Sequence, residues 1–163
     1  MPRSGNKLVV TDAGPLMALG RHDLLRLLPD LFQQVHVPHV VLDECLVHPH
    51  LLDAQRIQAA VTQGWLVRQD ARPLDIPGLD PGECCAIGCA LDMGAALLVD
   101  DRAARRHAEA FGLAVLGTLG VLVLAKRRGL LAEVKPIVLT MRDQGHHISQ
   151  AALDAVLQAA GEV

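Results

Sequence analysis

The sequence has 163 residues, of which 51% are hydrophobic and 20% charged, a composition typical of one folded domain with a buried core. It contains one tryptophan, two phenylalanines and no tyrosine, which argues against a protein that stacks the bases of single-stranded nucleic acids on aromatic side chains. The net charge of −3 gives no overall attraction to nucleic acids or to membranes.

The first ten residues, MPRSGNKLVV, are basic but lack the apolar stretch of a signal peptide. The longest apolar run, residues 119–125, is far shorter than the roughly 20 residues that cross a bilayer. We therefore expect a soluble, cytoplasmic protein. The cysteines form no CxxC pair, and we expect them to be small buried side chains without disulfides. They are Cys45, Cys84, Cys85 and Cys89.

Short apolar runs alternate with segments of helical spacing along the chain. Strands are predicted at residues 7–12, 33–38, 65–70, 96–101 and 113–117. Helices are predicted at residues 13–20, 39–47, 51–64, 80–94 and 102–112. Helical spacing within residues 23–32 is expected to be interrupted at Pro29. Three further helical stretches are predicted from Thr118 onward, separated near Gly129 and Gly145.

Short, continuously apolar strands that alternate with helices are typical of a parallel sheet covered on both faces. The sequence therefore predicts an α/β protein, a three-layer α/β/α sandwich around a central, mostly parallel sheet. We expect one domain over residues 1–163, with a core at about 7–130 and C-terminal helices at about 131–160. Ligands of such sheets bind at the carboxyl ends of the strands, so acidic residues there are the first candidates for a functional site.

Two acidic positions follow predicted strands directly. Asp12 ends the first strand, and Asp100 and Asp101 end the fourth. Glu44 and Glu83 lie in early helical turns beside apolar residues at helical spacing, so we expect both to point inward. The apolar neighbours are Val40, Val41, Val47 and Leu51 for the first glutamate, and Ala86, Ile87, Ala90 and Leu91 for the second. A buried carboxylate is costly unless it is paired or binds a metal ion.

Carboxylates gathered at one sheet edge would repel one another, by about 4 kcal/mol for two unit charges about 4 Å apart at an effective dielectric constant of about 20. Either some of them are protonated or a divalent cation compensates the charge. Oxygen ligands without matching cysteines and histidines favour Mg²⁺ or Mn²⁺ over zinc. Such ions activate water and stabilise charge on a phosphate. Arg102, Arg105 and Arg106 are candidates for binding a phosphate backbone beside the acids.

The same acids also have a structural interpretation. Asp12 and Asp101 each precede a predicted helix, where an aspartate commonly caps the N-terminus. The segment DPGE fits a capping box, with Asp80 at the N-cap and Glu83 three residues later. Glu44 and the arginines would then belong to a solvated surface. The residues alone leave both interpretations open.

Three segments resemble the PIN-domain family: VVTDAGPLMAL, LDPGECCAIGCALDMGAALLVDDRAARRHA and GLAVLGTLGVLVLAKRRGLL. The likeness runs from Lys7 to about Leu157 and is in particular with a prokaryotic branch that has LDPGE and DDRAARR motifs. Well-known relatives include the VapC toxins of bacterial toxin–antitoxin pairs, which are metal-dependent ribonucleases. The resemblance implies a PIN-like fold and RNA hydrolysis by in-line attack of a metal-activated water. It also makes a small antitoxin protein a candidate partner.

The resemblance further implies that Asp12, Glu44, Glu83 and Asp101 hold one or two Mg²⁺ or Mn²⁺ ions. Asp12 and Asp101 would be the chief ligands, and the two glutamates would complete the site or orient the water. Asp100 would support them without binding the ion directly. We also expect the protein to form a homodimer.

The sequence departs from the family pattern at two positions. Many relatives have Ser or Thr two residues after the first Asp, where this chain has Gly14, so a hydroxyl that could assist the site is missing. Glu83 stands where the family usually has Asp, which lengthens the ligand side chain by one methylene group. Both departures bear on activity and on metal geometry.

Three alternatives stay open. Cys45 and the histidines of HVPHVVLDECLVHPH could bind zinc, although their spacing matches no established zinc motif. A catalytically weak PIN-like module could bind nucleic acid or protein, using the apolar C-terminal helices to dimerise or to bind an antitoxin, but these helices could equally complete the core. Lys126, Arg127 and Arg128 form either a second phosphate-binding patch or the basic last turn of a helix.

Overall fold

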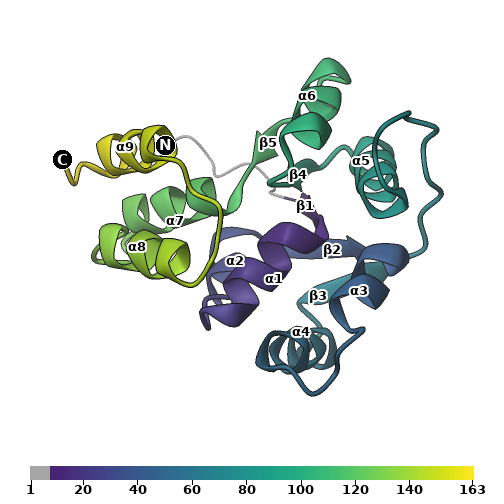
Figure 1. The fold of residues 1–163 in the computed structure, drawn as a ribbon. Coiled ribbons are helices and arrows are strands. Elements are labelled where there is room, and N and C mark those ends of the chain that lie inside the picture. Colours follow the sequence, from purple (N-terminus) through teal and green to yellow (C-terminus); the bar gives the residue numbers. More distant parts are fainter. Residues whose placement is uncertain (1–7) are drawn as a thin grey trace. The chain divides into compact units, whose positions relative to one another are not determined.

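The structure is a computed structural model that describes residues 8–163. Within these residues the chain forms the strands β1 (Leu8–Thr11), β2 (Gln34–Pro38), β3 (Leu66–Gln69), β4 (Ala96–Leu98) and β5 (Val115–Leu116) (Figure 1). The helices are α1 (Ala13–Arg21), α2 (Leu27–Leu31), α3 (His39–Cys45), α4 (Leu52–Gln63), α5 (Pro81–Met93), α6 (Arg102–Ala110), α7 (Thr118–Arg127), α8 (Lys135–Asp143) and α9 (Gln150–Ala160). Each predicted strand is present but shorter than expected, and Lys7 lies outside the described residues.

The five strands are all parallel, in the order β3-β2-β1-β4-β5. From β1 at the centre the chain moves outward through β2 and β3 on one side, and it then crosses to β4 and β5 on the other. The carboxyl ends of β1 and β4 therefore flank the point where the strand order reverses. Ligands of open parallel sheets bind at such a point.

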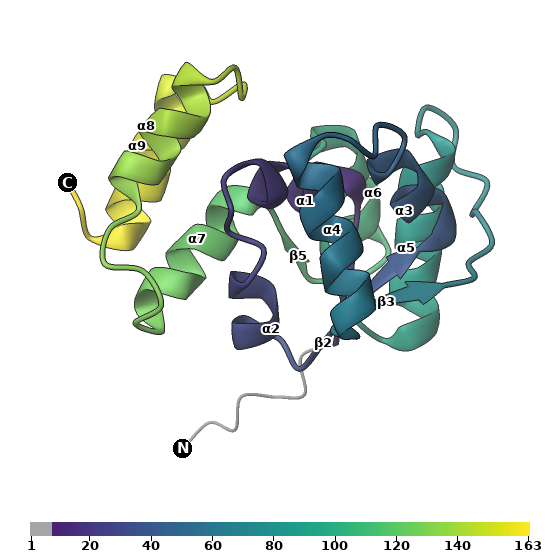
Figure 2. The same ribbon diagram turned by 90° about the horizontal axis from the view of Figure 1, so that it is seen from below.

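The helices form two layers because right-handed crossovers in opposite directions emerge on opposite faces of the sheet. α1 and α4 pack against each other on one face, whereas α5 contacts β1, β2 and β4 on the other face, with α6 beside it (Figures 1 and 2). α3 contacts both α1 and α5. The predicted α/β/α sandwich with a parallel sheet is confirmed.

Small side chains let α5 lie close to the sheet. Val10 and Leu97, which are paired neighbours on β1 and β4, are buried in one cluster with Ile87 and Ala90 of α5 and Ala104 of α6. Alanines, cysteines and two glycines fill most buried positions of α5. The carboxyl ends of the two central strands and the N-terminus of α5 are thereby held by one apolar core.

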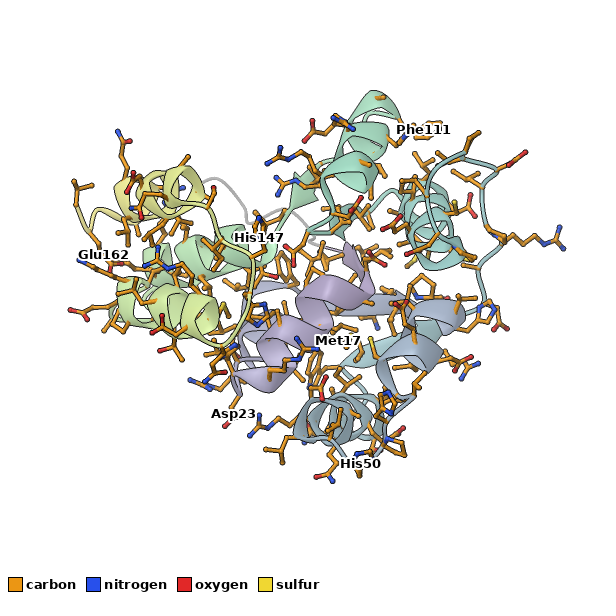
Figure 3. The ribbon with its side chains drawn as sticks, in the orientation of Figure 1. Met17, Asp23, His50, Phe111, His147 and Glu162 are labelled. Atoms are coloured by element: carbon orange, nitrogen blue, oxygen red, sulfur yellow. The ribbon has the colours of Figure 1, made fainter. Side chains whose placement is uncertain are left out.

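Helix α1, which begins next to Asp12, is fixed against α4. A Cβ at Gly20 would lie 3.2 Å from the Cβ of Asp53 on α4, so the glycine permits this close approach. Arg56 of α4 donates a hydrogen bond to the carbonyl of Gly20 at 2.7 Å and forms an ion pair of 3.5 Å with Asp23. Asp23, which follows the C-terminal end of α1, is labelled in Figure 3. These contacts satisfy a carbonyl at the C-terminal end of α1 that has no partner within the helix.

Helix α2 contains Pro29, where the sequence predicted an interruption. The helix starts at Leu27, so Pro29 is its third residue and lies in the first turn. An N–H in the first turn has no partner within the helix, and a proline there costs little. The predicted interruption was wrong because the helix begins later than the apolar pattern suggested.

The chain divides into two compact units, Met1–Thr118 and Leu119–Val163. The first contains the sheet and α1 to α6, and the second contains most of α7 together with α8 and α9. In the second unit, buried apolar side chains include Leu122, Val138, Met141, Leu153 and Val156. This burial favours a core role for the apolar C-terminal helices. The single domain expected over residues 1–163 stays a prediction.

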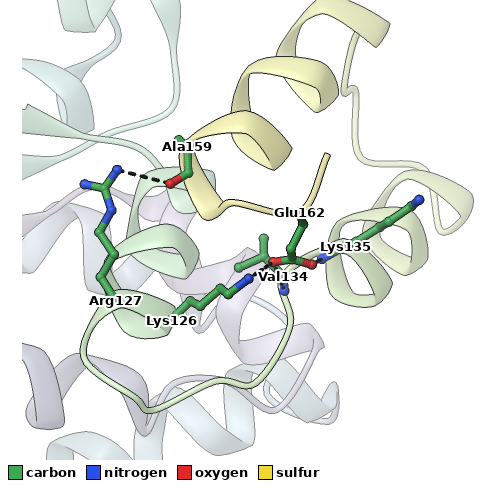
Figure 4. A network of polar contacts seen from close by, with 6 residues as sticks. All are labelled: Lys126, Arg127, Val134, Lys135, Ala159 and Glu162. Carbon is green, nitrogen blue, oxygen red and sulfur yellow. Dashed lines mark hydrogen bonds and ion pairs between the residues drawn. The ribbon is translucent and has the colours of Figure 1, made fainter.

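Glu162 joins three segments of the second unit (Figure 4). Its carboxylate accepts hydrogen bonds from Lys126 Nζ at 2.9 Å, from the N–H of Val134 at 2.8 Å and from the N–H of Lys135 at 3.0 Å. Arg127 donates to a backbone carbonyl near the end of α9 at 3.1 Å. Lys126 and Arg127 thus have structural partners, which favours the helix-end interpretation of this basic segment over a phosphate-binding patch.

The structure also bears on the cysteines and on segments that could cross a membrane. All four cysteines are free and buried, as predicted. No helix among residues 8–163 combines the length and the apolarity needed to cross a membrane.

Candidate active site

Asp12 lies at the point where the strand order reverses. It follows β1, and its backbone N–H donates a hydrogen bond of 2.9 Å to the carbonyl of Leu98 at the end of β4. The residue is only 8% exposed and occupies the N-cap position of α1, but its side chain forms no capping hydrogen bond with that helix. The carboxylate is therefore held between two parallel strands and is not used as a cap, contrary to the structural interpretation.

The environment of Asp12 disfavours its charged form. The pKa of its carboxyl group is raised from 3.8 to about 7, mainly by burial and also by the negative charges of Glu83, Asp80 and Glu44, whereas the hydrogen bond from the backbone N–H of Ala13 acts in the opposite direction. Three acidic side chains therefore raise the pKa of Asp12, one from α3 and two from the start of α5. Burial and the neighbouring negative charges therefore both disfavour the charged form of Asp12.

Asp80 and Glu83 form a capping box at the start of α5. The N–H of Glu83 donates to Asp80 Oδ1 at 2.8 Å, and the N–H of Asp80 donates to Glu83 Oε2 at 3.1 Å. Pro81 occupies the first helical position, where its missing N–H is harmless. Glu83 is half-buried, and burial raises its pKa, as do the charges of Asp80, Asp101 and Glu44, while its hydrogen bond to the Asp80 backbone lowers it. Glu83 therefore caps α5 and also belongs to the acidic cluster.

Glu44 reaches the same cluster from α3 but lies at the surface, so the expectation that it points inward was wrong. α3 ends at Cys45, and Val47 beyond it is 63% exposed, so the expected apolar row does not continue along one helix. A Cβ at Gly82 would lie 3.3 Å from Glu44 Oε2, which places this carboxylate beside the first turn of α5. Desolvation and the charge of Asp80 raise the pKa of Glu44.

The two aspartates after β4 have different partners. Asp101 caps α6, with its Oδ2 accepting a 2.9 Å hydrogen bond from the N–H of Ala104. Asp100 accepts hydrogen bonds from Thr118, at 2.7 Å from the N–H and at 2.6 Å from the hydroxyl. Its Oδ2 would lie 3.4 Å from a Cβ at Gly14, in ordinary contact. Asp100 therefore borders the start of α1, whereas Asp101 is within electrostatic range of Glu83.

The three arginines of α6 follow these aspartates directly. Arg102 and Arg106 are exposed, and Arg105 is partly buried. A Cβ at Gly117 would lie 2.9 Å from Arg105 Nη1 and 3.0 Å from Asp100 Oδ1, so the glycine leaves the space that these groups occupy. The salt bridges formed among the described residues involve none of the six acids discussed above. Within residues 8–163, no lysine or arginine in direct contact thus neutralises the negative charge of the cluster.

The donor set suits a hard divalent cation, because carboxylate oxygens are the ligands that Mg²⁺ and Mn²⁺ prefer. No three acidic, histidine or cysteine side chains among residues 8–163 converge into a ready-made metal cage. Mg²⁺ commonly takes one or two carboxylates and completes its shell with water and substrate phosphate. Asp12 and the acidic side chains near it are therefore the groups that would hold such an ion, together with water.

The zinc alternative has no support in the described part of the chain. Cys45 is buried, and burial raises the pKa of its thiol to about 12, which disfavours the thiolate that zinc requires. The ring of His36 interacts with Gln34 at 3.0 Å and with Gln69 at 2.7 Å. No group of three potential ligands forms around these residues.

The sequence interpretation missed two residues of this region. Asp80 was assigned only a capping role, although its charge acts on Asp12, Glu44 and Glu83. Thr118 was recognised only as the start of a helix, although it is 5% exposed and holds Asp100. A threonine that follows a strand and a glycine is a weak signal, because such residues cap helices in most proteins.

Comparison with known proteins gives one family. A model of the family DUF3368, described as a PIN domain, matches residues 8–162. The chain also resembles a PilT N-terminus domain protein from the hyperthermophilic archaeon Sulfolobus solfataricus P2, with 11% sequence identity and a TM-score of 0.48 over 87% of this chain and 99% of that one. A search of the curated proteins gave no match. PIN domains are generally nucleases and typically bind divalent metal ions. The family match covers nearly the whole chain, which therefore belongs to the PIN-domain family.

Proposed function

We propose that this protein is a metal-dependent endoribonuclease of the VapC-like branch of PIN domains. The observation that carries the proposal is the position of Asp12, a buried carboxylate at the strand switch point that lies among acidic side chains and forms no salt bridge with a lysine or arginine of residues 8–163. Membership of a family of nucleases supports the reaction class. RNA as the substrate and Mg²⁺ or Mn²⁺ as the ion belong to the proposal.

The proposed ligands are Asp12 and Asp101, with Glu44 and Glu83 completing the site. Bound Mg²⁺ or Mn²⁺ would activate a water molecule and stabilise the charge that develops on the scissile phosphate. Asp12 is suited to a fixed position because its backbone is hydrogen-bonded to β4. Glu44, at the exposed edge, would orient the attacking water through its carboxylate. Asp100 would support the site through its hydrogen bonds to Thr118.

Arg102, Arg105 and Arg106 are proposed to bind the RNA backbone. Their position immediately after Asp101 on α6 supports this role, because a phosphodiester at the acids would bring its neighbouring phosphates close to the same helix. Arg102 and Arg106 are exposed and available for such contacts. Phosphate contacts of this kind position a substrate and do not by themselves read its sequence.

We further propose that the protein acts as the toxin of a toxin–antitoxin pair, with a small antitoxin protein as its partner, and that it forms a homodimer in the cytoplasm. The toxin role and the antitoxin partner rest on the resemblance to the VapC toxins. Co-purification with the product of a neighbouring small gene, and the molar mass in solution, would test them separately from catalysis.

A second candidate function is a PIN-like module that binds nucleic acid or protein with little catalysis. Two observations favour it. The carboxylates of Glu83 and Asp101 already accept capping hydrogen bonds, and no three potential ligands among residues 8–163 converge on one point. The two candidates differ in whether metal-dependent cleavage occurs.

The deciding experiment uses a panel of labelled RNAs and single-stranded DNAs with Mn²⁺, Mg²⁺ or EDTA. Asp12→Asn and Asp101→Asn proteins serve as the site variants, and Asp92→Asn is a control because Asp92 is exposed in the last turn of α5. Cleavage of RNA that requires metal and is lost in both site variants would support the proposal. Metal binding without cleavage would favour the binding module. The absence of metal binding would contradict the assignment of Asp12 and Asp101 as metal ligands.

A further inference from the structure

Three sulfur-containing side chains follow one face of α5. Cys85, Cys89 and Met93 are spaced four residues apart, so each lies about one helical turn from the next. Cys85 and Cys89 are 1% and 5% exposed, whereas Met93 is partly exposed at the C-terminal end of the helix. We call these three side chains the sulfur row, which is buried at Cys85 and reaches solvent at Met93.

The sulfur atoms of Cys89 and Met93 are in contact. Cys89 Sγ lies 3.7 Å from Met93 Sδ, and within residues 8–163 this is the only hydrogen-bonding contact of the thiol. Two sulfur ligands of one metal ion, each about 2.3 Å from it at a tetrahedral angle, are about 3.8 Å apart. The observed separation therefore matches that of two ligands bound to a single ion.

Cys85 is the third sulfur donor of the row. Its thiol contacts the carbonyl of Ala71 at 3.7 Å, a weak hydrogen bond that a metal ion can replace. Burial raises the pKa of both thiols, as do the charge of Cys84 at Cys85 and the charges of Asp92 and Cys85 at Cys89. The two thiols of the sulfur row are thus within electrostatic range of each other, and a cation that binds them would displace their protons.

The kinds of donor in the sulfur row select the ion. No three His, Cys, Asp or Glu side chains among residues 8–163 form a group, so an ion held by the two thiols needs the thioether of Met93 as its third ligand. Zinc sites are built from Cys, His and carboxylate ligands, and Mg²⁺ and Mn²⁺ prefer oxygen. Thiolate and thioether ligands together favour Cu⁺.

We propose that Cys85, Cys89 and Met93 form a binding site for Cu⁺, separate from the acids at the strand ends. Glu83 lies in the first turn of α5, and Cys89 follows six residues later, about 9 Å along the helix axis. Three sulfur atoms would surround the ion, and the negative charge of Asp92 would lie nearby. Because the two sites use different residues, this inference does not depend on the proposed nuclease activity.

The test compares two thiols of the same helix. Cys89→Ala removes a proposed ligand, and Cys84→Ala is the matched control, because both cysteines are 5% exposed. Cys84 lies on another face of α5, where its Sγ contacts the carbonyls of Ile76 and Leu79 at 3.8 and 3.9 Å. Met93→Leu removes the thioether and conserves the apolar volume at a partly exposed position. If Cys89→Ala does not fold, the methionine variant provides the test.

Binding of Cu⁺ is measured without oxygen by competition with a chromogenic Cu⁺ chelator, and circular dichroism checks the fold. Loss of a supporting group costs a metal site about 10–100-fold in affinity, so we expect Cys89→Ala to weaken Cu⁺ binding by about 100-fold and Met93→Leu by about 10-fold. Cys84→Ala should leave the affinity unchanged.

Three results would each overturn the inference. They are equal weakening in Cys84→Ala and Cys89→Ala, unchanged affinity in folded Met93→Leu, and failure of the unsubstituted protein to bind Cu⁺. The proposed nuclease function would stand in every case, because it is measured with Mn²⁺ or Mg²⁺ and RNA.

Discussion

Thr118 and Asp100 form a two-point contact: the N–H and the hydroxyl of the threonine each donate to a different oxygen of the carboxylate, at 2.7 and 2.6 Å. The pair connects the end of β4 to the first residue of α7. Asp100 is otherwise at the surface, so without this contact its side chain would sample several rotamers. Thr118 thereby fixes an acid next to the proposed active site.

Replacing Thr118 by valine removes the hydroxyl and keeps the shape and the backbone N–H. We expect the free energy of unfolding to fall by about 1 kcal/mol, because a hydrogen bond to a charged group is lost and the remaining oxygen is still bound. Urea unfolding measures this change. Thr62→Val is the control, since the hydroxyl of Thr62 bonds only to its own helix at the surface. Equal stability of the Thr118 variant and the unsubstituted protein would mean that the hydroxyl contributes nothing.

The raised pKa of Asp12 makes stability depend on pH in the absence of metal. The folded-state pKa of about 7 lies above the ordinary value of 3.8, so the favourable contribution is complete below about pH 4 and is lost as the pH rises through 7. The full effect is about 4 kcal/mol at most. Thermal unfolding in EDTA should therefore show a decline over this range that Asp12→Asn largely removes.

Divalent cations should reverse this decline. A bound cation favours the charged carboxylate, so Mn²⁺ at pH 7.5 is expected to stabilise the unsubstituted protein and to have little effect on Asp12→Asn. Mn²⁺ affinity should rise with pH and level off above about 7, once Asp12 is deprotonated. An affinity that does not change between pH 5 and pH 8 would contradict the assignment of Asp12 as a ligand.

Glu83 permits a separation of its two roles. Glutamine at this position keeps an oxygen for the N–H of Asp80, so Glu83→Gln should fold normally but bind Mn²⁺ more weakly and cleave more slowly. Glu83→Ala loses the cap as well and should also be less stable by about 0.5–1 kcal/mol. Thermal unfolding of both variants measures the capping role, and their Mn²⁺ affinity measures the role in metal binding. Unchanged Mn²⁺ affinity in both variants would restrict Glu83 to capping.

The arginines of α6 should contribute to RNA binding through charge. Arg102→Gln and Arg106→Gln are each expected to weaken binding of unrelated RNA sequences to a similar extent. Each should also reduce the slope of log affinity against log salt concentration by about 0.7, the value for one contact to a single strand. Arg72→Gln is the control, because Arg72 is exposed in the loop between β3 and α5 and belongs to no proposed binding surface. RNA affinity is measured by fluorescence anisotropy over a series of salt concentrations. An unchanged slope in both variants would mean that these arginines do not contact the RNA backbone.

Glu162 should stabilise the second unit over most of the pH range. Hydrogen bonds from the N–H groups of Lys135 and Val134, together with Lys126, lower its pKa to about 2. Its contribution is therefore present above the ordinary value of 4.5 and is lost as the pH falls toward 2. Glu162→Ala should speed amide hydrogen exchange at Val134 and Lys135. Glu133→Gln, an exposed acid beside the same segment, should leave exchange slow.

The order of strands and helices could be predicted because it depends on local patterns. A short apolar run between helical segments, such as residues 8–11, favours a strand. The DPGE segment predicts a capping box, and the structure has this capping box. Pro29 was misplaced because a proline is tolerated in a first turn, and the start of a helix depends on packing that the sequence pattern does not reveal.

The candidate site was predictable only in part. Parallel strands bring their carboxyl ends to one edge, so the positions of Asp12 and of the pair after β4 follow from the fold class. The orientation of Glu44 did not follow, because the apolar residues near it belong partly to a loop and not to one helix face. Helical periodicity fails as a guide where a helix has only seven residues.

The sequence by itself determined the α/β class, the parallel sheet and the acids at the strand ends, because apolar periodicity and strand-end positions are local properties of the chain. Tertiary structure alone decided that Thr118 holds Asp100 and that Asp80 lies within electrostatic range of Asp12. Both relationships join residues far apart in the sequence. They depend on how the chain crosses between the strands, and the position of Asp100 also depends on Gly117, where a Cβ would lie 3.0 Å from Asp100 Oδ1.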